Sequence, residues 1–257
     1  MSHHITEAKE LFYSYPDGHR AVNGISFCIH HGESVGIIGA NGAGKSTLLM
    51  LLNGILTPFQ GDVIIGEVKL NKSTLNMIRQ RLGMVFQDPD DQLFMTTVYD
   101  DVAFGPRNLK IDEPQVERRV LSALEQVGIA HLKDRAPFHL SAGEKRAAAI
   151  ATVLSMSPDI LFLDEPTSSL DPKSRRRLMN ILKGFEHTKI ITSHDLDMVL
   201  ELCSRVIVLK NGQVIADGPA KDILTNKKMM EEAGLEVPLS LQKCPVCGKT
   251  KPDADFR

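Results

Sequence analysis

The sequence predicts an α/β fold in which a mostly parallel sheet is covered by helices, with an antiparallel edge subdomain and a helical insertion. Three observations lead to this prediction. Short apolar runs alternate with helical patterns, a glycine-rich segment joins one such run to a helix, and residues 112–157 carry helical periodicity without a strand pattern. Because alternating strands and helices form parallel sheets that are buried on both faces, the sheet should lie inside the molecule.

The first elements are expected to form the antiparallel edge. Residues 10–38 alternate apolar runs with turn residues, in the order LFYSY, PDG, ISFCIHHGE and SVGIIG, which is the pattern of short strands joined by turns. The helical run STLLMLLNGIL follows and stops at Gly54 and Pro58. VIIG and LGMVFQ then predict two further strands, so the glycine-rich segment lies between a buried strand and a helix.

The middle of the chain has helical rather than strand patterns. EPQVERRVLSALEQVGI and EKRAAAIATVLSMS are amphipathic helical patterns, which indicate a helical subdomain inserted at about residues 88–157. DILFLDEP, TKIITSHD and SRVIVLKNGQVIADG return to strands, and the composition shifts to Lys, Glu and Pro after about residue 226. We therefore expect one domain over residues 1–225 and a tail over residues 226–257.

The length, the charge and the cysteine content of the chain exclude several classes of function. With 257 residues, 42% hydrophobic content and a net charge of -2, the chain can bury a real core and has no general attraction to nucleic acid or anionic lipid. The N-terminal segment lacks a basic stretch followed by an apolar run, and no uncharged apolar segment approaches the roughly 20 residues that span a bilayer. Four cysteines are too few for a disulfide framework.

A phosphate-binding loop is the strongest motif. Residues 39–46, GANGAGKS, match G-x-x-x-x-G-K-[ST] between a predicted strand and a predicted helix. The glycines let successive N–H groups point at one phosphate, Lys45 supplies charge between the outer phosphates, and Ser46 is expected to hold Mg²⁺. The alternative is a glycine-rich turn with an incidental lysine. The expected nucleotide-binding residues of this P-loop NTPase core are Gly39, Ala40, Asn41, Gly42, Ala43, Gly44, Lys45, Ser46 and Thr47.

Two carboxylates follow a buried strand. In the run ILFLDE, four apolar residues precede Asp164 and Glu165, which places both at the carboxyl end of the strand, where α/β sheets bind ligands. Asp164 is expected to bind Mg²⁺ through water. Glu165 is the candidate general base for an attacking water, and the alternative is an exposed carboxylate without a role.

A helix start elsewhere offers a second anion site. Ser141 and Gly143 stand at the beginning of the run EKRAAAIATVL, and unpaired N–H groups at a helix start attract phosphate. The same pattern also fits a simple capping box, in which Glu144 reaches back to Ser141. The residues alone leave both interpretations open.

With these motifs in order, the sequence resembles the ATP-binding subunits of ABC transporters over residues 5 to about 225. The phosphate loop, Gln87, the signature-like LSAGE at residues 140–144, ILFLDEP, Asp171 and His194 carry the resemblance. It implies ATP and Mg²⁺ as ligands and ATP hydrolysis as the activity. It also implies a head-to-tail dimer, with itself or with a related ATPase, in which Ser141 and Gly143 contact the γ-phosphate bound by the other chain.

The resemblance assigns further roles. Tyr15 would stack on adenine, although a half-buried strand tyrosine is the alternative. Gln87 would sense Mg²⁺ and the γ-phosphate, Asp171 would link the two sites, and His194 would contact the γ-phosphate and help to hold Glu165 and water. Ala142 departs from the family, which usually has glycine there. Its methyl group could crowd the nucleotide or forbid a positive φ, which would slow hydrolysis.

Residues 85–109 resemble the energy-coupling-factor importers of cobalt, nickel or vitamins, and especially the cobalt-transport ATPases. This likeness implies a transmembrane energy-coupling partner that docks at residues of about 87–105, and a peripheral location at the cytoplasmic face of the cell membrane. Leu93, Phe94, Met95 and Val98 are the expected docking patch, and the alternative is a covered loop that completes the core. A soluble ABC ATPase or a regulatory module that binds ATP without turnover are the other functions considered.

The tail carries Cys244 and Cys247 in the run CPVCGK, which is one half of a zinc ribbon. Cys28 and Cys203 are expected in the core, so two tails would have to supply four thiolates to one zinc ion. A redox pair and a knuckle without metal are the alternatives.

Overall fold

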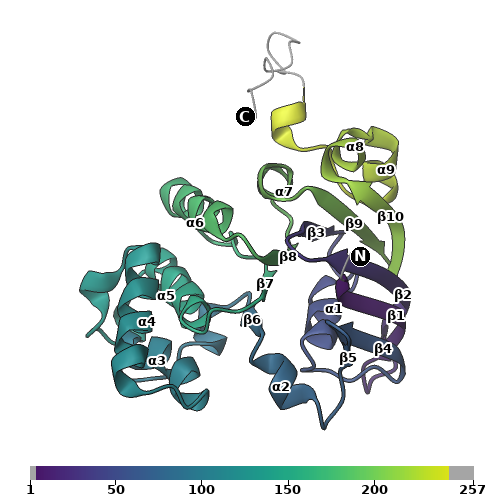
Figure 1. Cartoon of the computed structure of the whole chain (residues 1–257). Helices are drawn as coiled ribbons and strands as arrows, with labels where there is room; N and C mark the ends of the chain where they lie inside the picture. Colours follow the sequence, from purple (N-terminus) through teal and green to yellow (C-terminus); the bar gives the residue numbers. More distant parts are fainter. Residues whose placement is uncertain (1–3, 243–257) are drawn as a thin grey trace.

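The computed structural model describes residues 4–242, which form two sheets with helices packed around them (Figure 1). The six-stranded sheet has the order β10-β9-β3-β8-β7-β6. Its strands β6, β7, β8, β3 and β9 are parallel, and β10 pairs with β9 in the antiparallel sense. The bounds are β3 (Ser34–Ile38), β6 (Leu82–Val85), β7 (Ile160–Asp164), β8 (Thr188–Thr192), β9 (Arg205–Lys210) and β10 (Gln213–Pro219).

The antiparallel edge forms a sheet of its own with the order β2-β1-β4-β5. Its strands are β1 (His4–Ser14), β2 (Arg20–His30), β4 (Gln60–Ile65) and β5 (Val68–Lys69). Helix α1 (Lys45–Leu52) is buried between the two sheets through Leu48, Leu49, Leu51 and Leu52. Helix α1, which directly follows the phosphate loop, is therefore packed between the two sheets.

The central strands alternate between two core clusters. Ile160 and Phe162 of β7 pack with α1 and the antiparallel sheet, whereas Leu161 and Leu163 pack with the helices on the other face. A strand that is covered on both faces reads as a continuous apolar run, which is the pattern of ILFLD. The α/β fold class predicted from the sequence is therefore confirmed.

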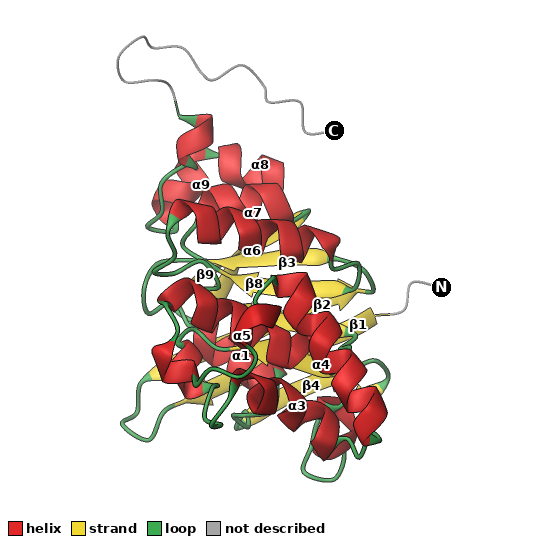
Figure 2. Cartoon of the chain, turned by 90° about the vertical axis from the view of Figure 1, so that its left-hand side faces the viewer, coloured by secondary structure: helices red, strands yellow, loops and turns green. Residues whose placement is uncertain are grey.

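A separate group of helices lies beside the parallel sheet (Figures 1 and 2). It consists of α3 (Val98–Asn108), α4 (Glu113–Val127) and α5 (Ala142–Leu154), which pack on one another. Helix α4 ends at Gly128, whose φ of 65° is the left-handed conformation that glycine tolerates at a helix end. Ser141 caps α5 through the predicted capping box with Glu144.

The remaining helices pack at several different places around the sheet. They are α2 (Leu75–Arg79), α6 (Pro172–Gly184), α7 (Leu196–Leu202), α8 (Ala220–Thr225) and α9 (Lys227–Glu232), with short 3₁₀ turns at Pro89–Asp91, Ala130–Leu132, Pro137–His139 and Leu239–Leu241. The boundary expected near residue 225 lies between α8 and α9. Met230 and Ala233 beyond it are buried in the same core cluster as Val206.

The cysteines differ from the prediction in one case. Cys203 is buried, and burial raises the pKa of its thiol to about 12, so it is an inert core residue. Cys28 is only partly buried, because it lies on β2 between the inward-facing Phe27 and Ile29. Cys244 and Cys247 lie outside the described residues.

Candidate functional site

The phosphate loop connects the end of β3 to the start of α1, as predicted. Gly44 has a φ of 100°, and a Cβ atom there would lie 2.3 Å from the carbonyl oxygen of Ala21. A Cβ atom on Gly39 would lie 2.3 Å from the carbonyl oxygen of Leu209. Any side chain at either position would therefore displace neighbouring backbone, and the tight loop requires glycine at both.

Lys45 is pre-oriented inside this loop. Its Nζ donates to the carbonyl oxygens of Gly39 at 2.9 Å and Ala40 at 3.2 Å, and it lies 3.3 Å from Nε2 of His194. Burial lowers the pKa of Lys45, while the nearby Glu165 and Asp164 act in the opposite direction. The ammonium group is thus partly desolvated beside weak neutral acceptors, a setting in which an anionic phosphate is a better partner.

Two hard oxygen donors lie beside the lysine. The hydroxyl of Ser46 donates to Oδ1 of Asp164 at 3.1 Å, and the hydroxyl of Thr192 donates to the same oxygen at 2.5 Å. Asp164 is 3% exposed. A buried carboxylate next to a serine hydroxyl offers the oxygen ligands that Mg²⁺ prefers, so these residues fit the ion expected from the sequence.

Glu165 is held in an unusual backbone conformation. Its φ is 45°, a region that costs a non-glycine residue roughly 1–3 kcal/mol and that is found preferentially at functional sites. Oε2 accepts the backbone N–H of His194 at 3.0 Å. Oε1 lies 3.1 Å from Nε2 of His194, yet among the described residues no hydrogen bond of acceptable geometry reaches it. One carboxylate oxygen of Glu165 is thus held by a hydrogen bond, whereas the other has only a poorly aligned contact with the His194 ring.

Lys45, Ser46, Glu165 and His194 line one cavity of about 290 Å³, whereas Gly39, Ala40 and Asp164 lie outside its lining. The structure brings Tyr15, Gln87, Glu165 and His194 together with residues 41–47 of the loop. The hydroxyl of Tyr15 is 3.0 Å from Oγ1 of Thr47, and its ring meets Tyr13 edge to face. His19 and Ala21 also line the cavity, although no motif in the sequence marks them.

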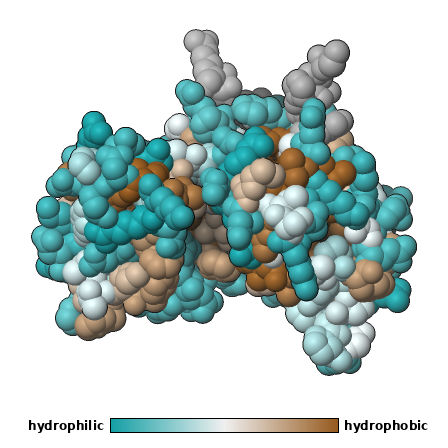
Figure 3. Space-filling view, turned by 60° about the horizontal axis from the view of Figure 1, so that its bottom comes forward, coloured by the Kyte–Doolittle hydropathy of each residue, from teal (hydrophilic) through white to brown (hydrophobic). Residues whose placement is uncertain are grey.

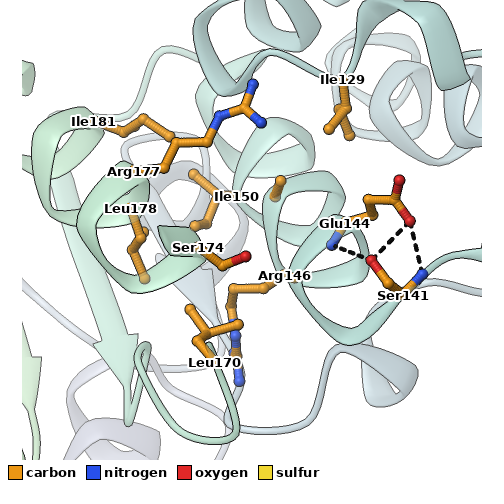
Figure 4. Close-up of a pocket in the computed structure, with 12 residues that line it drawn as sticks. Ile129, Ser141, Glu144, Arg146, Ile150, Leu170, Ser174, Arg177, Leu178 and Ile181 are labelled. Carbon is orange, nitrogen blue, oxygen red and sulfur yellow. Dashed lines mark hydrogen bonds between the residues drawn. The ribbon is translucent and has the colours of Figure 1, made fainter. Parts of the chain in front are cut away.

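Ser141 and Gly143 do not line that cavity. They border a second one, of about 80 Å³, between the start of α5 and helix α6 (Figure 4). A Cβ atom on Gly143 would lie 2.6 Å from Oγ of Ser174 and 3.9 Å from Oδ2 of Asp171. Within the described chain the predicted site residues therefore fall into two groups, one around Lys45 and one at the N-terminal start of α5.

Asp171 belongs to the second group. Its carboxylate caps α6 by accepting the backbone N–H groups of Lys173 at 2.9 Å and Ser174 at 3.1 Å. Hydrogen bonds from the hydroxyl and backbone of Ser174 lower the pKa of Asp171. Ala142 is exposed in the first turn of α5 and has a negative φ, so a required positive φ is excluded as a reason for slow hydrolysis.

Two of the four residues expected in the docking patch are not exposed. Leu93 and Val98 are buried in the core, because they anchor the segment that enters α3. Phe94 is 64% exposed and meets the partly exposed ring of Phe104 edge to face at 5.0 Å. No motif in the sequence marks Phe104 as a neighbour of Phe94. Figure 3 shows apolar surface on the lobe formed by the helical group.

Comparisons with known proteins identify the family of this chain. A sequence model described as ABC transporter matches residues 22–168. A protein of Geobacter sulfurreducens named as an ABC transporter ATP-binding protein is 63% identical over 97% of this chain and 100% of its own length. The energy-coupling factor transporter ATP-binding protein EcfA of Carboxydothermus hydrogenoformans is 48% identical over 91% of this chain and 87% of its own length.

Two solved structures extend the comparison. CbiO1 of Clostridium perfringens, described as part of the ABC transporter complex cbiONQ, has a TM-score of 0.79 and 41% identity, covering 90% of this chain and 95% of its own. MJ0796, a bacterial ABC transporter cassette solved as a dimer, has a TM-score of 0.77 and 27% identity, covering 84% and 98%.

Within residues 4–242 no helix is both long enough and apolar enough to cross a membrane. The phosphate loop, the two carboxylates at the carboxyl end of β7 and the family match lead to one assignment. This chain is an ATP-hydrolysing subunit of the ABC transporter family and belongs with its energy-coupling-factor members.

Proposed function

We propose that this chain powers an energy-coupling-factor importer for cobalt or a related metal ion. One observation carries the ATPase part of the proposal, which is the cavity that gathers Lys45, Gln87, Glu165 and His194. The likeness to EcfA and to CbiO1 supports the choice of importer. The metal ion itself is supported only by the resemblance of residues 85–109 to cobalt-transport ATPases.

The proposal gives tasks to several residues of the cavity. Lys45 leaves the carbonyl oxygens of Gly39 and Ala40 for the outer phosphates, because a charged acceptor binds an ammonium group more strongly. Tyr15 offers a ring for adenine. Oε1 of Glu165 takes the proton of the attacking water, while the backbone N–H of His194 fixes the other carboxylate oxygen.

Ser46, Asp164 and Gln87 would hold Mg²⁺. The ion would neutralise negative charge on the β- and γ-phosphate oxygens. The contact between Ser46 and Asp164 supports this assignment.

The proposed working unit is a head-to-tail dimer. Ser141 and Gly143 lie outside the cavity of their own loop, and the N-terminus of α5 offers N–H groups to an anion. In the dimer each α5 would complete the site of the other chain. The dimeric structure of MJ0796 supports a dimer as the working unit. Whether the second chain is identical or a related ATPase does not alter the chemistry.

The proposed membrane contact uses residues of about 87–105, with Phe94 and Phe104 as its apolar centre. These two exposed aromatic side chains pack on each other, and together they offer an apolar surface on which a partner helix could dock. Through this contact the chain would sit at the cytoplasmic face of the cell membrane as a peripheral subunit. Nucleic acid is not a proposed partner, since the net charge is -2.

Co-purification tests the assignment. Detergent extraction of the tagged chain should recover membrane proteins. Vesicles that contain the recovered complex should take up Co²⁺ only when ATP is present on the side of the membrane where the ATPase lies. Recovery of ribosomes or nucleic acid would support a soluble ABC ATPase instead. ATP binding without phosphate release would support a regulatory module.

A zinc ion shared by the tails of two chains is a separate proposal. Cys244 and Cys247 of each chain would supply its four thiolates. Metal analysis of the purified dimer should find zinc that is lost in Cys244→Ser. Absence of zinc from the unchanged dimer would leave a redox pair or an empty knuckle.

A further inference from the structure

Arg146 is a buried cation that has no role in the chemistry described so far. It lies in the second turn of α5 and is 3% exposed. Burial lowers the pKa of its guanidinium group, and the charges of Asp88 and Asp164 oppose that effect. Within residues 4–242 no carboxylate oxygen comes within 4.0 Å of it, and its Nε has no hydrogen-bond partner. A buried charge without a paired carboxylate is costly, so its position needs an explanation.

The guanidinium group joins two segments of the nucleotide cavity. Nη1 donates to the carbonyl oxygen of Phe86 at 2.7 Å, and Nη2 donates to that of Gln87 at 2.5 Å. Nη2 also lies 3.4 Å from the hydroxyl of Ser168. The backbone N–H of Ser168 in turn donates to the carbonyl oxygen of Glu165 at 3.1 Å. One side chain therefore reaches both the Gln87 segment and the turn that begins at Glu165.

The same residue belongs to the helix that starts at the signature. Ser141 caps α5 and Gly143 lies in its first turn, so the backbone hydrogen bonds of one helix connect them rigidly to Arg146. A second link runs parallel to it, since Gln92 donates to the carbonyl oxygen of Ala149 at 2.8 Å and accepts the N–H of Phe86 at 3.2 Å. Of these two links, the one through Arg146 is the one that includes a hydrogen bond to Gln87 itself.

We propose that Arg146 is a positioning residue that fixes Gln87 and the Glu165 turn relative to the signature end of α5. Gln87 and Glu165 act on the nucleotide bound to the chain's own loop, whereas Ser141 contacts the nucleotide bound to the partner. Arg146 would keep these two sets of residues at a fixed distance and orientation. Arginine suits this task because its planar group carries several fixed donors and stays charged, whereas lysine offers one flexible nitrogen. The inference rests on the proposed roles of Gln87 and Ser141.

The test compares Arg146→Met and Arg146→Lys with Lys145→Met. Lys145 is the matched control, because it is the neighbouring cation on α5 and pairs with the exposed Asp90 at 2.6 Å. Phosphate release is measured against ATP and against Mg²⁺, and ATP affinity is measured separately by equilibrium binding. Arg146→Met should lower kcat by at least about tenfold, since small misplacement of catalytic groups has effects of this size. Its half-saturating Mg²⁺ concentration should rise several-fold while its Kd for ATP stays within about twofold.

Arg146→Lys should lie between Arg146→Met and the unchanged protein, and Lys145→Met should match the unchanged protein. Unchanged kcat and Mg²⁺ dependence in a folded Arg146→Met protein would overturn the inference, as would a loss of ATP affinity equal to the loss of kcat. If Arg146→Met does not fold, Arg146→Lys decides, and normal kinetics in that variant would overturn it. Absence of Mg²⁺-dependent hydrolysis in the unchanged protein would instead remove the proposed function.

Discussion

Glu165 and His194 contact each other at two points. The backbone N–H of His194 donates to one carboxylate oxygen at 3.0 Å, and its ring nitrogen Nε2 lies 3.1 Å from the other. The same ring nitrogen is 3.3 Å from Nζ of Lys45. The candidate base, the histidine after β8 and the phosphate-loop lysine therefore form one cluster, and movement of phosphate into it must rearrange all three.

The first prediction concerns the base. Glu165→Gln should bind ATP with nearly unchanged affinity, because the amide has the same shape and can still accept the N–H of His194. Phosphate release should slow by about 10²–10⁴-fold, the usual contribution of a general base. Single-turnover phosphate release and equilibrium ATP binding are the measurements. Near-normal turnover would remove Glu165 from the role.

The second prediction separates capping from phosphate binding at α5. Ser141→Ala and Glu144→Ala each break the capping box, in which Ser141 N–H donates to Oε2 of Glu144 at 2.8 Å, and each should cost about 1 kcal/mol of unfolding free energy. Only Ser141→Ala also removes the hydroxyl proposed to contact the partner's γ-phosphate. Its kcat should fall by at least about tenfold, whereas Glu144→Ala should stay within about twofold in kcat.

Urea unfolding monitored by circular dichroism gives the stability of both variants, and phosphate release gives their rates. Equal losses of rate in Ser141→Ala and Glu144→Ala would mean that Ser141 acts only as a helix cap.

Much of the site could be predicted because local sequence determines it. Gly39 and Gly44 stand where a side chain would strike the backbone, and Asp164 and Glu165 come directly after a strand whose apolar run marks it as buried. Gln87 and His194 entered through the resemblance, and the structure places them on the same cavity.

The remaining features depend on packing between distant segments. Inside the loop before α3 no periodicity tells that Leu93 points inward and Phe94 outward, and the partner of Phe94 is Phe104, ten positions later. Arg146 reads as an ordinary helix residue, because the carbonyl groups that it binds follow β6, about sixty positions earlier. His19 likewise reaches the cavity only because β2 lies against the loop.

The third prediction concerns the proposed membrane contact. Phe94→Glu should abolish ATP-driven uptake in vesicles, because a charge replaces an exposed aromatic side chain at the centre of the patch. ATP binding and dimer formation by the isolated chain should stay normal, since Phe94 lies outside the nucleotide cavity. Phe59→Glu is the matched control, because Phe59 is 61% exposed on the antiparallel side. Uptake that survives Phe94→Glu would exclude this surface.

The fourth prediction concerns Asp195, the carboxylate that directly follows His194. Asp195 accepts from Arg175 Nη2 at 2.7 Å, from Thr167 Oγ1 at 3.2 Å and from the N–H of Met198 at 3.0 Å, which caps α7. Burial alone would raise the pKa of Asp195, but its hydrogen bonds, chiefly those from Arg175, hold that pKa below its ordinary value. Asp195→Asn should therefore lower the unfolding free energy by about 1–3 kcal/mol at neutral pH.

The pH dependence has a definite sign. A carboxyl group with a lowered pKa in the folded state contributes stability that is fully present above its unfolded pKa, about 3.9, and is lost as pH falls through the folded value. The stability difference between the unchanged protein and Asp195→Asn should thus be constant from pH 6 to 8 and shrink below about pH 4. Asp159→Asn is the control, since its pair with Arg81 is exposed and should contribute less than about 1 kcal/mol. A difference that grows on acidification would show that the charge of Asp195 destabilises the fold.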